Sequence, residues 1–292
     1  MTAPRWNLNN IYPDFNDEKY RSDVQKLAVA IETLSSAISS PEKTGDSVSW
    51  TAKCIDGYNT ATDLYENLGS YAYTRFSTDT KDAEASKELN KLEEAALPLK
   101  STLVAFRNSL ADIAEIVAGE SFRNELETRC GESYAFFLGE QLELQKKQMS
   151  PAEEDLAEDL ARAGGSAWTR QQEAISSTLS MLWDEQTGER KTVIQLRSLA
   201  FSPDRTVRNK AFKLETEAWK QVEIPIAFSL NGVKGFSVSL NKRRSYEHSL
   251  EGPLMQSRIS RETLDALISA MEQSLPAFRR YLKAKAKYLG LD

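Results

Sequence analysis

Apolar residues recur every three or four positions along most of the 292-residue chain, which is the spacing of one face of an α-helix. Such stripes run from Tyr20 to Ile38, from Cys54 to Phe76 and from Leu89 to Leu110. Two more run from Val207 to Ala218 and from Leu264 to Phe278. Because successive residues of a strand would instead alternate between two faces, this pattern predicts an all-α fold.

Before the first stripe, the apolar cluster Trp6–Tyr12 is predicted to pack as an anchoring arm. Asp14 and Asn16 are the N-cap candidates for the first helix, since their side chains can accept a hydrogen bond from its unpaired N–H groups. Residues 41–46 contain Pro, Gly and Thr and are predicted to form a short loop.

The third stripe is predicted to begin at Asp79 or Thr80. Pro98 lies inside it and should kink the helix, because proline removes one backbone hydrogen bond. Gly119 breaks the helical pattern, and we place a domain boundary near Asp112.

Shorter elements follow in the middle of the chain. Ser150–Glu153 is a capping box with proline at the first helical position, and Gly164–Gly165 is expected to end the helix that it begins. Ile175–Trp183 and Gly188–Lys191 can pair as a small hairpin. Thr192–Gln195 is a second capping box, which predicts a short helix directly after the hairpin.

Two helical patterns flank a basic loop in the last third of the chain. Ser202 is the expected cap of the first, with Pro203 in its first turn and Asp204 near its positive end. Pro276 predicts a kink or break in the second, and Gly290 is a natural stop for it.

Composition excludes several classes of protein. The net charge is −6, from 37 basic and 43 acidic residues, which argues against a general nucleic-acid binder. The sequence has no run of eighteen apolar residues that would span a membrane, and its N-terminus lacks the apolar region of a secretory signal. Its two cysteines, Cys54 and Cys130, are too few for a disulfide framework and are expected to be reduced thiols of a cytoplasmic protein.

The residue count also limits the chemistry. His248 is the one histidine, so the chain cannot form the HExxH zinc motif, which needs two. Ser245 stands where an E-x-x-H pair ending at His248 would need a glutamate. The acidic run from Glu153 to Asp159 is predicted to be a solvated helix face opposite Leu156 and Leu160; paired catalytic carboxylates are the alternative.

The basic segment Asn241–Tyr246 is the most informative local feature. Its arginines could receive a peptide carboxylate, which guanidinium groups bind through two hydrogen bonds. The alternative is a solvated loop with an anchoring tyrosine. The candidate binding residues are Arg243, Arg244, Tyr246 and His248, although for His248 an ordinary place on a surface loop is the default.

Several segments together resemble one protein family. They are SPDRTVRNKAF, LNGVKGF, NKRRSYEHSLEGPL, ISRETLDALISAM, KAKAKYLGLD, MSPAEEDLAEDLARAGGSAW and, more weakly, RWNLNNIYP and YAYTRFSTDT. Their content and order resemble the oligoendopeptidase F branch of the thimet-oligopeptidase family of zinc metallopeptidases. The resemblance covers the first half of such a protein, and the zinc-binding HExxH helix of the family belongs to the second half.

The resemblance implies a multi-helical N-terminal lobe over residues 1–110 and a small helical domain over 111–183. Residues 192–292 would begin a catalytic domain that is truncated before the zinc motif. The complete protein would be a cytoplasmic zinc endopeptidase that cuts oligopeptides inside an enclosed channel, with Glu as general base. This part would supply the lid and channel wall, and the resemblance makes Arg243, Arg244, Tyr246 and His248 the candidate substrate-channel residues. Its partners would be the peptide substrate and the missing catalytic half, with no nucleic acid and no membrane.

No catalytic or metal-binding residue is carried over from the family, and residues 1–292 alone are expected to hold no catalytic zinc and to hydrolyse nothing. A stand-alone helical scaffold or interaction protein is the alternative, and a truncated relative with a regulatory role is a third. The last apolar stripe, which includes Leu275, Phe278 and Leu282, distinguishes the first two. A fragment should expose this stripe, whereas a self-sufficient scaffold should bury it.

Overall fold

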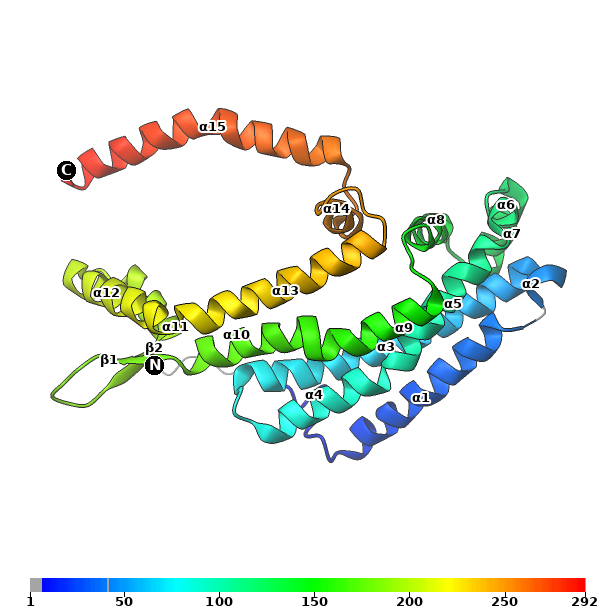
Figure 1. The fold of residues 1–292 in the computed structure, drawn as a ribbon, viewed down its shortest axis with the longest axis horizontal. Coiled ribbons are helices and arrows are strands. Elements are labelled where there is room, and N and C mark those ends of the chain that lie inside the picture. Colours follow the sequence, from blue (N-terminus) through cyan, green and yellow to red (C-terminus); the bar gives the residue numbers. More distant parts are fainter. Residues whose placement is uncertain (1–6, 41, 292) are drawn as a thin grey trace. The chain divides into compact units, whose positions relative to one another are not determined.

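The computed structural model describes residues 7–40 and 42–291. Helices make up most of these residues, and their sheet consists of one antiparallel pair of short strands, so the all-α prediction with one hairpin is confirmed (Figure 1). Internal contacts divide the chain into two compact units, Met1–Ser237 and Val238–Asp292. The predicted domain boundaries at residues 110, 183 and 192 stay predictions.

The helices and the two strands follow one another with short connections. In chain order they are α1 (Glu18–Ile38), α2 (Glu42–Gly45), α3 (Ser47–Thr78), α4 (Ala83–Ala95), α5 (Leu97–Ala111), α6 (Ala114–Val117), α7 (Glu120–Cys130), α8 (Ala135–Gln145), α9 (Pro151–Ala161), the π-helix η1 (Arg162–Ser166), α10 (Ala167–Thr178), β1 (Ser180–Leu182), β2 (Arg190–Thr192), α11 (Val193–Ser198), the 3-10 helix η2 (Leu199–Phe201), α12 (Arg205–Gln221), α13 (Glu223–Arg243), α14 (Glu251–Ser257) and α15 (Arg261–Tyr288). Helix α13 begins in the first unit and ends in the second.

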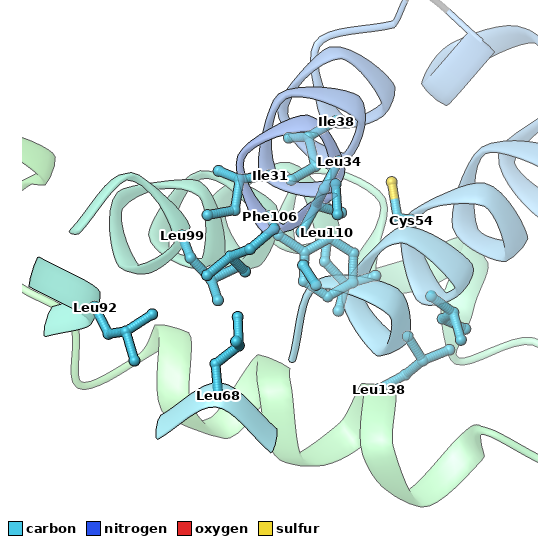
Figure 2. Packing of buried hydrophobic residues seen from close by; sticks show 14 of the residues in the cluster. Ile31, Leu34, Ile38, Cys54, Leu68, Leu92, Leu99, Phe106, Leu110 and Leu138 are labelled. Atoms are coloured by element: carbon cyan, nitrogen blue, oxygen red, sulfur yellow. The ribbon is translucent and has the colours of Figure 1, made fainter. Parts of the chain in front are cut away.

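The main core lies between α1, α3 and the helices that follow them. Figure 2 shows the predicted stripes meeting there, with Leu34 of α1, Leu68 of α3 and Phe106 of α5 directed into one cluster. Trp50 is completely buried in the same cluster. Gly57 allows α3 to approach α1 closely, because a Cβ at that position would lie 3.2 Å from Leu34 Cδ1.

The segment before α1 is held by aromatic contacts. Tyr12, Phe15, Tyr20 and Tyr71 form a buried group of rings packed mostly edge to face. The Tyr12 hydroxyl donates a hydrogen bond to Asp23 Oδ2 at 3.0 Å, and burial, followed by this bond, raises the pKa of Tyr12 to about 12. The predicted anchoring arm is confirmed for its described part, and Trp6 lies outside the described residues.

Two predictions about the first part of this unit were wrong, the cap of the first helix and the loop at 41–46. Asp17, rather than Asp14 or Asn16, caps α1 by accepting a hydrogen bond from Lys19 N–H at 3.0 Å. Asp14 instead accepts one from Asn16 N–H at 2.7 Å and shapes the turn before the helix. The expected loop at 41–46 contains the short helix α2, although Pro41 itself lies outside the described residues.

The stripe through Pro98 forms two helices rather than one kinked helix. Asp82 caps α4, so this helix begins after the predicted Asp79 or Thr80. It ends at Ala95, and Pro98 lies in the first turn of α5. Proline is tolerated there because the N–H groups of a first turn have no helical partner.

Gly164 and Gly165 do not end a helix, so the prediction that they end the one beginning at Ser150 was wrong. They lie in η1, which continues directly into α10. Their missing side chains make room for α13, because a Cβ would lie 3.2 Å from Phe236 Cδ2 at Gly164 and 3.0 Å from Phe236 Cδ1 at Gly165. On α13, a Cβ added at Gly232 would overlap the Trp168 indole ring. The glycines therefore serve close helix packing rather than chain reversal.

Both capping boxes are confirmed, at Ser150 and at Thr192. The hairpin also forms, but β1 is shorter than predicted because residues 175–178 belong to α10. Before α12, Asp204 is the cap and accepts a hydrogen bond from Thr206 N–H at 2.7 Å. The predicted roles of Ser202 as cap and Pro203 in the first turn were therefore wrong.

The second unit is built from the end of α13, α14 and α15. Pro276 lies inside α15, which continues through it without a break. Figure 1 shows the helix bending about half-way along its length, where Pro276 falls, so the kink prediction is confirmed. Gly290 ends the helix with a positive φ of 63°, as predicted.

Substitution of Gly232 tests the packing of α13. Gly232→Ala should lower the free energy of unfolding by about 1–3 kcal/mol, because the new methyl group overlaps Trp168. Gly235→Ala is the matched control in the same helix, since a Cβ there meets no atom within 4 Å. The control should raise stability by up to about 1 kcal/mol, as alanine favours helix over glycine. Thermal unfolding that shows equal shifts for both variants would contradict this packing.

Candidate functional site

The four predicted channel residues lie where α13 ends and α14 begins. Arg243 is the last residue of α13, and Arg244, Tyr246 and His248 follow in the connection to α14. The basic segment is therefore not entirely a loop as predicted, because Asn241, Lys242 and Arg243 form the last turn of the helix. Cations are favoured at that position, since the carbonyl end of a helix carries partial negative charge.

The connection is fixed by a Schellman motif, a turn that satisfies the last carbonyl groups of a helix. Ser245 has a positive φ of 54°, and Tyr246 N–H donates to Asn241 O at 3.1 Å. Arg244 N–H donates to Leu240 O at 2.8 Å. The same motif ends α14, where Arg258 has a φ of 55° and Ile259 N–H donates to Leu254 O at 3.2 Å. Neither turn could be predicted from the sequence, because glycine is the usual residue at the position with positive φ and these turns have Ser245 and Arg258 there.

The start of α14 holds the other side of the connection. The backbone of Gly252 lies close to the Tyr246 ring, since a Cβ there would be 3.7 Å from it. Glu247 N–H donates to Glu251 Oε2 at 2.7 Å, and Glu251 N–H donates to His248 O at 3.1 Å. Tyr246 therefore rests against α14, as expected of an anchoring tyrosine.

The candidates differ in exposure. Arg243 and His248 are exposed, whereas Arg244 and Tyr246 are half-buried. Arg243 Nη1 donates to Ser239 O at 3.4 Å, along its own helix. The structure thus brings two guanidinium groups and a tyrosine into one short, ordered turn. Such a turn can bind a carboxylate, because guanidinium groups bind carboxylates through two hydrogen bonds.

The described residues do not offer a zinc site. Within 7–40 and 42–291, no group of three or more His, Cys, Asp or Glu side chains is placed to hold a metal ion. His248, the one histidine of the chain, is exposed. These residues therefore do not fit the zinc ion that the family resemblance implies, and no step of a reaction is assigned to them.

The acidic run of α9 is structural, and part of it is buried. Glu154 is buried and accepts a hydrogen bond from Met149 N–H at 3.0 Å. Asp155 accepts one from the Ser101 hydroxyl at 2.9 Å, and Glu158 forms an ion pair with Lys100. The prediction of a solvated acidic face is therefore wrong for Glu154, whereas Glu153, Asp155 and Asp159 are exposed as predicted. Because these carboxylates bind α5 and the backbone before α9, the helix is rotated so that its leucines, Leu156 and Leu160, are exposed.

The two cysteines are not reactive groups. Cys54 is completely buried, and this burial raises the pKa of its thiol to about 12. Burial also raises the pKa of Cys130, which lies at the end of α7. Since the thiolate is the nucleophilic form, neither residue is suited to catalysis.

Comparison with known proteins agrees with this architecture. Residues 124–180, from α7 to the first residue of β1, match the family model Peptidase_M3_N, described as Oligopeptidase F. The crystal structure of oligoendopeptidase-F from Enterococcus faecium superposes with a TM-score of 0.74 at 16% sequence identity, covering 95% of this chain and 54% of that one. The resemblance to oligoendopeptidase F is confirmed.

Two other solved structures share the fold. A Bacillus anthracis protein assigned as an oligoendopeptidase F has a TM-score of 0.63 at 16% identity, covering 96% of this chain and 47% of that one. A Chlamydophila abortus protein assigned as a peptidase has a TM-score of 0.56 at 15% identity, covering 98% and 48%. The chain thus spans about half the length of the oligoendopeptidase F structures that it resembles. Curated protein sequences give no match.

The described helices contain none that is long and apolar enough to cross a membrane. The predicted apolar stripe of α15 is exposed along its length, including Leu275, Phe278 and Leu282.

Replacement of Ser245 tests the turn that orders the candidate residues. Ser245→Val should destabilise the turn by about 1–2 kcal/mol, because a β-branched residue is strained at positive φ. Ser245→Gly should keep or strengthen it. Amide hydrogen exchange at Tyr246 reports the result, since its N–H closes the turn. Unchanged protection in the valine variant would mean that the turn does not depend on this backbone conformation.

Proposed function

We propose that this chain forms the N-terminal part of a zinc metalloendopeptidase that hydrolyses short oligopeptides in an enclosed channel. The observation that carries the proposal is the superposition of 95% of the chain on 54% of the Enterococcus faecium oligoendopeptidase-F. The match of residues 124–180 to the Oligopeptidase F family supports it independently, because it rests on sequence rather than shape.

In this proposal the chain supplies the lid and channel wall, and the zinc-binding catalytic half is its partner. The exposed apolar stripe of α15 supports this role, because a face of that size needs a partner in water. The arginines at the end of α13 would receive the carboxylate of a peptide substrate. The active protein would be cytoplasmic.

Zinc, when bound by the catalytic half, would polarise the scissile carbonyl group and activate a water molecule. The residues of this chain would contribute binding, orientation and exclusion of large substrates. A channel wall of rigid helices limits access to extended peptides, and folded proteins would be excluded by size.

Activity and metal content test the proposal together. The longest natural protein that contains this chain should bind one zinc ion and cleave a quenched-fluorescence oligopeptide. Purified residues 1–292 should do neither, because the described residues lack a metal-binding group. Metal analysis and the peptide assay on both proteins give the answer.

Each of two results would contradict the proposal. Tightly bound zinc with peptidase activity in residues 1–292 would overturn the assignment of this chain to the non-catalytic part. A longest natural protein with neither zinc nor activity would overturn the peptidase function and favour the helical scaffold.

A further inference from the structure

A small pocket lies between α11 and α12. It has a volume of about 190 Å³ and is lined on one side by α11 and η2 and on the other by α12. The α12 residues that line it include Arg208, Phe212, Glu215 and Trp219, which recur every three or four positions and therefore share one helix face. All of this pocket belongs to the first unit.

Five of the nine residues that line the pocket are apolar. Leu196 and Ala211 are buried at its base. Phe212 is 68% exposed, and it lines the pocket together with the half-buried Trp219. Apolar walls with few polar groups are typical of small-ligand sites.

A carboxylate lines the pocket next to Trp219. Glu215 is buried, and its Oε1 accepts hydrogen bonds from Arg197 Nε at 2.7 Å and from Trp219 Nε1 at 3.4 Å. The Arg197 guanidinium also forms an ion pair with this oxygen through Nη2, at 2.5 Å. Among the described residues, Glu215 Oε2 has no hydrogen-bond donor, so it can accept one from a ligand.

A guanidinium group also lines the pocket. Arg208 Nη1 donates to the carbonyl oxygens of Ser202 at 2.7 Å and Pro203 at 2.9 Å. Its nearest acidic neighbour in sequence, Asp204, caps α12 through Thr206 N–H. Within the described part of the chain, Nε and Nη2 of Arg208 have no acceptor, so they can donate to a carboxylate.

The spacing of these two groups defines the ligand. Arg208 and Glu215 are seven residues apart, which is about two helical turns or about 10 Å along the axis. We propose that this pocket binds a short peptide with free ends, whose ammonium group meets Glu215 Oε2 and whose carboxylate meets Arg208. An apolar side chain of the peptide lies against Phe212 and Trp219.

The choice of peptides as ligand rests on the proposed function, because cleavage of oligopeptides yields short products with free ends. Each end of the peptide then meets a group of opposite charge. Arg197 donates to Glu215 Oε1, so the ammonium shares this carboxylate with Arg197 and binds it through Oε2. The peptide carboxylate pairs with Arg208.

NMR of purified residues 1–292 tests the site, with the dipeptide Ala-Leu as probe. The chain has five tryptophans, so its indole N–H signals are few, and a Trp219→Phe variant assigns the one needed. Ala-Leu should shift the Trp219 signal to saturation. N-acetyl-Ala-Leu-amide, which lacks both charged ends, should bind about tenfold or more weakly.

Two exposed phenylalanines supply matched variants. Phe212→Ala removes a wall of the pocket and should weaken Ala-Leu binding about tenfold. Phe201→Ala is the control, because Phe201 is 90% exposed and is not among the pocket residues. Both side chains are on the surface, so neither substitution should unfold the chain.

Three results would overturn the proposal: no saturable shift at Trp219, equal binding of the blocked peptide, or equal effects of the two phenylalanine variants. These failures are distinguishable from failure of the proposed function. If Ala-Leu does not bind but the longer natural protein cleaves peptides, only the pocket assignment is lost. If Ala-Leu binds and the longer protein is inactive, the pocket stands and the peptidase function falls.

Discussion

The close contact between the backbone of α13 and the Trp168 ring is the constraint on which this arrangement most depends. Gly232 is the contact point on α13, and Gly164 and Gly165 form the matching surface that receives Phe236. A Cβ at Gly232 would overlap the Trp168 ring, and a Cβ at Gly164 or Gly165 would crowd the Phe236 ring. The single buried residue of α13 is Ser229, so this helix is held by shape rather than by a large apolar interface.

This contact also bears on which side chains of α13 are exposed. Because the helix packs along one side, Ile224, Phe228 and Val238 remain exposed on it. Its far end carries Arg243 and leads into the turn at Ser245, which places the candidate carboxylate-binding groups.

Much of the fold follows from local sequence signals, and the failures have identifiable causes. The stripes of α1, α3 and α12 and both capping boxes could be predicted, because each depends on neighbours within a turn or two. The role of Gly164 and Gly165 could not, since it depends on Phe236, which is distant in sequence. The burial of Glu154 could not be predicted either, because it depends on how α9 packs against α5. The residues of the candidate site at the end of α13 could be predicted, but the positive φ at Ser245 could not. The pocket between α11 and α12 could not be predicted either, because it forms only when the two helices pack together.

Proximity of Gly232 to Trp168 can be measured directly by NMR with selectively protonated glycine and tryptophan. The account predicts strong nuclear Overhauser effects between the Gly232 α-protons and the Trp168 indole protons. It also predicts an upfield ring-current shift of those α-protons, because they lie against the ring. Absence of both signals in the folded chain would contradict the glycine contact that holds α13 to the first unit.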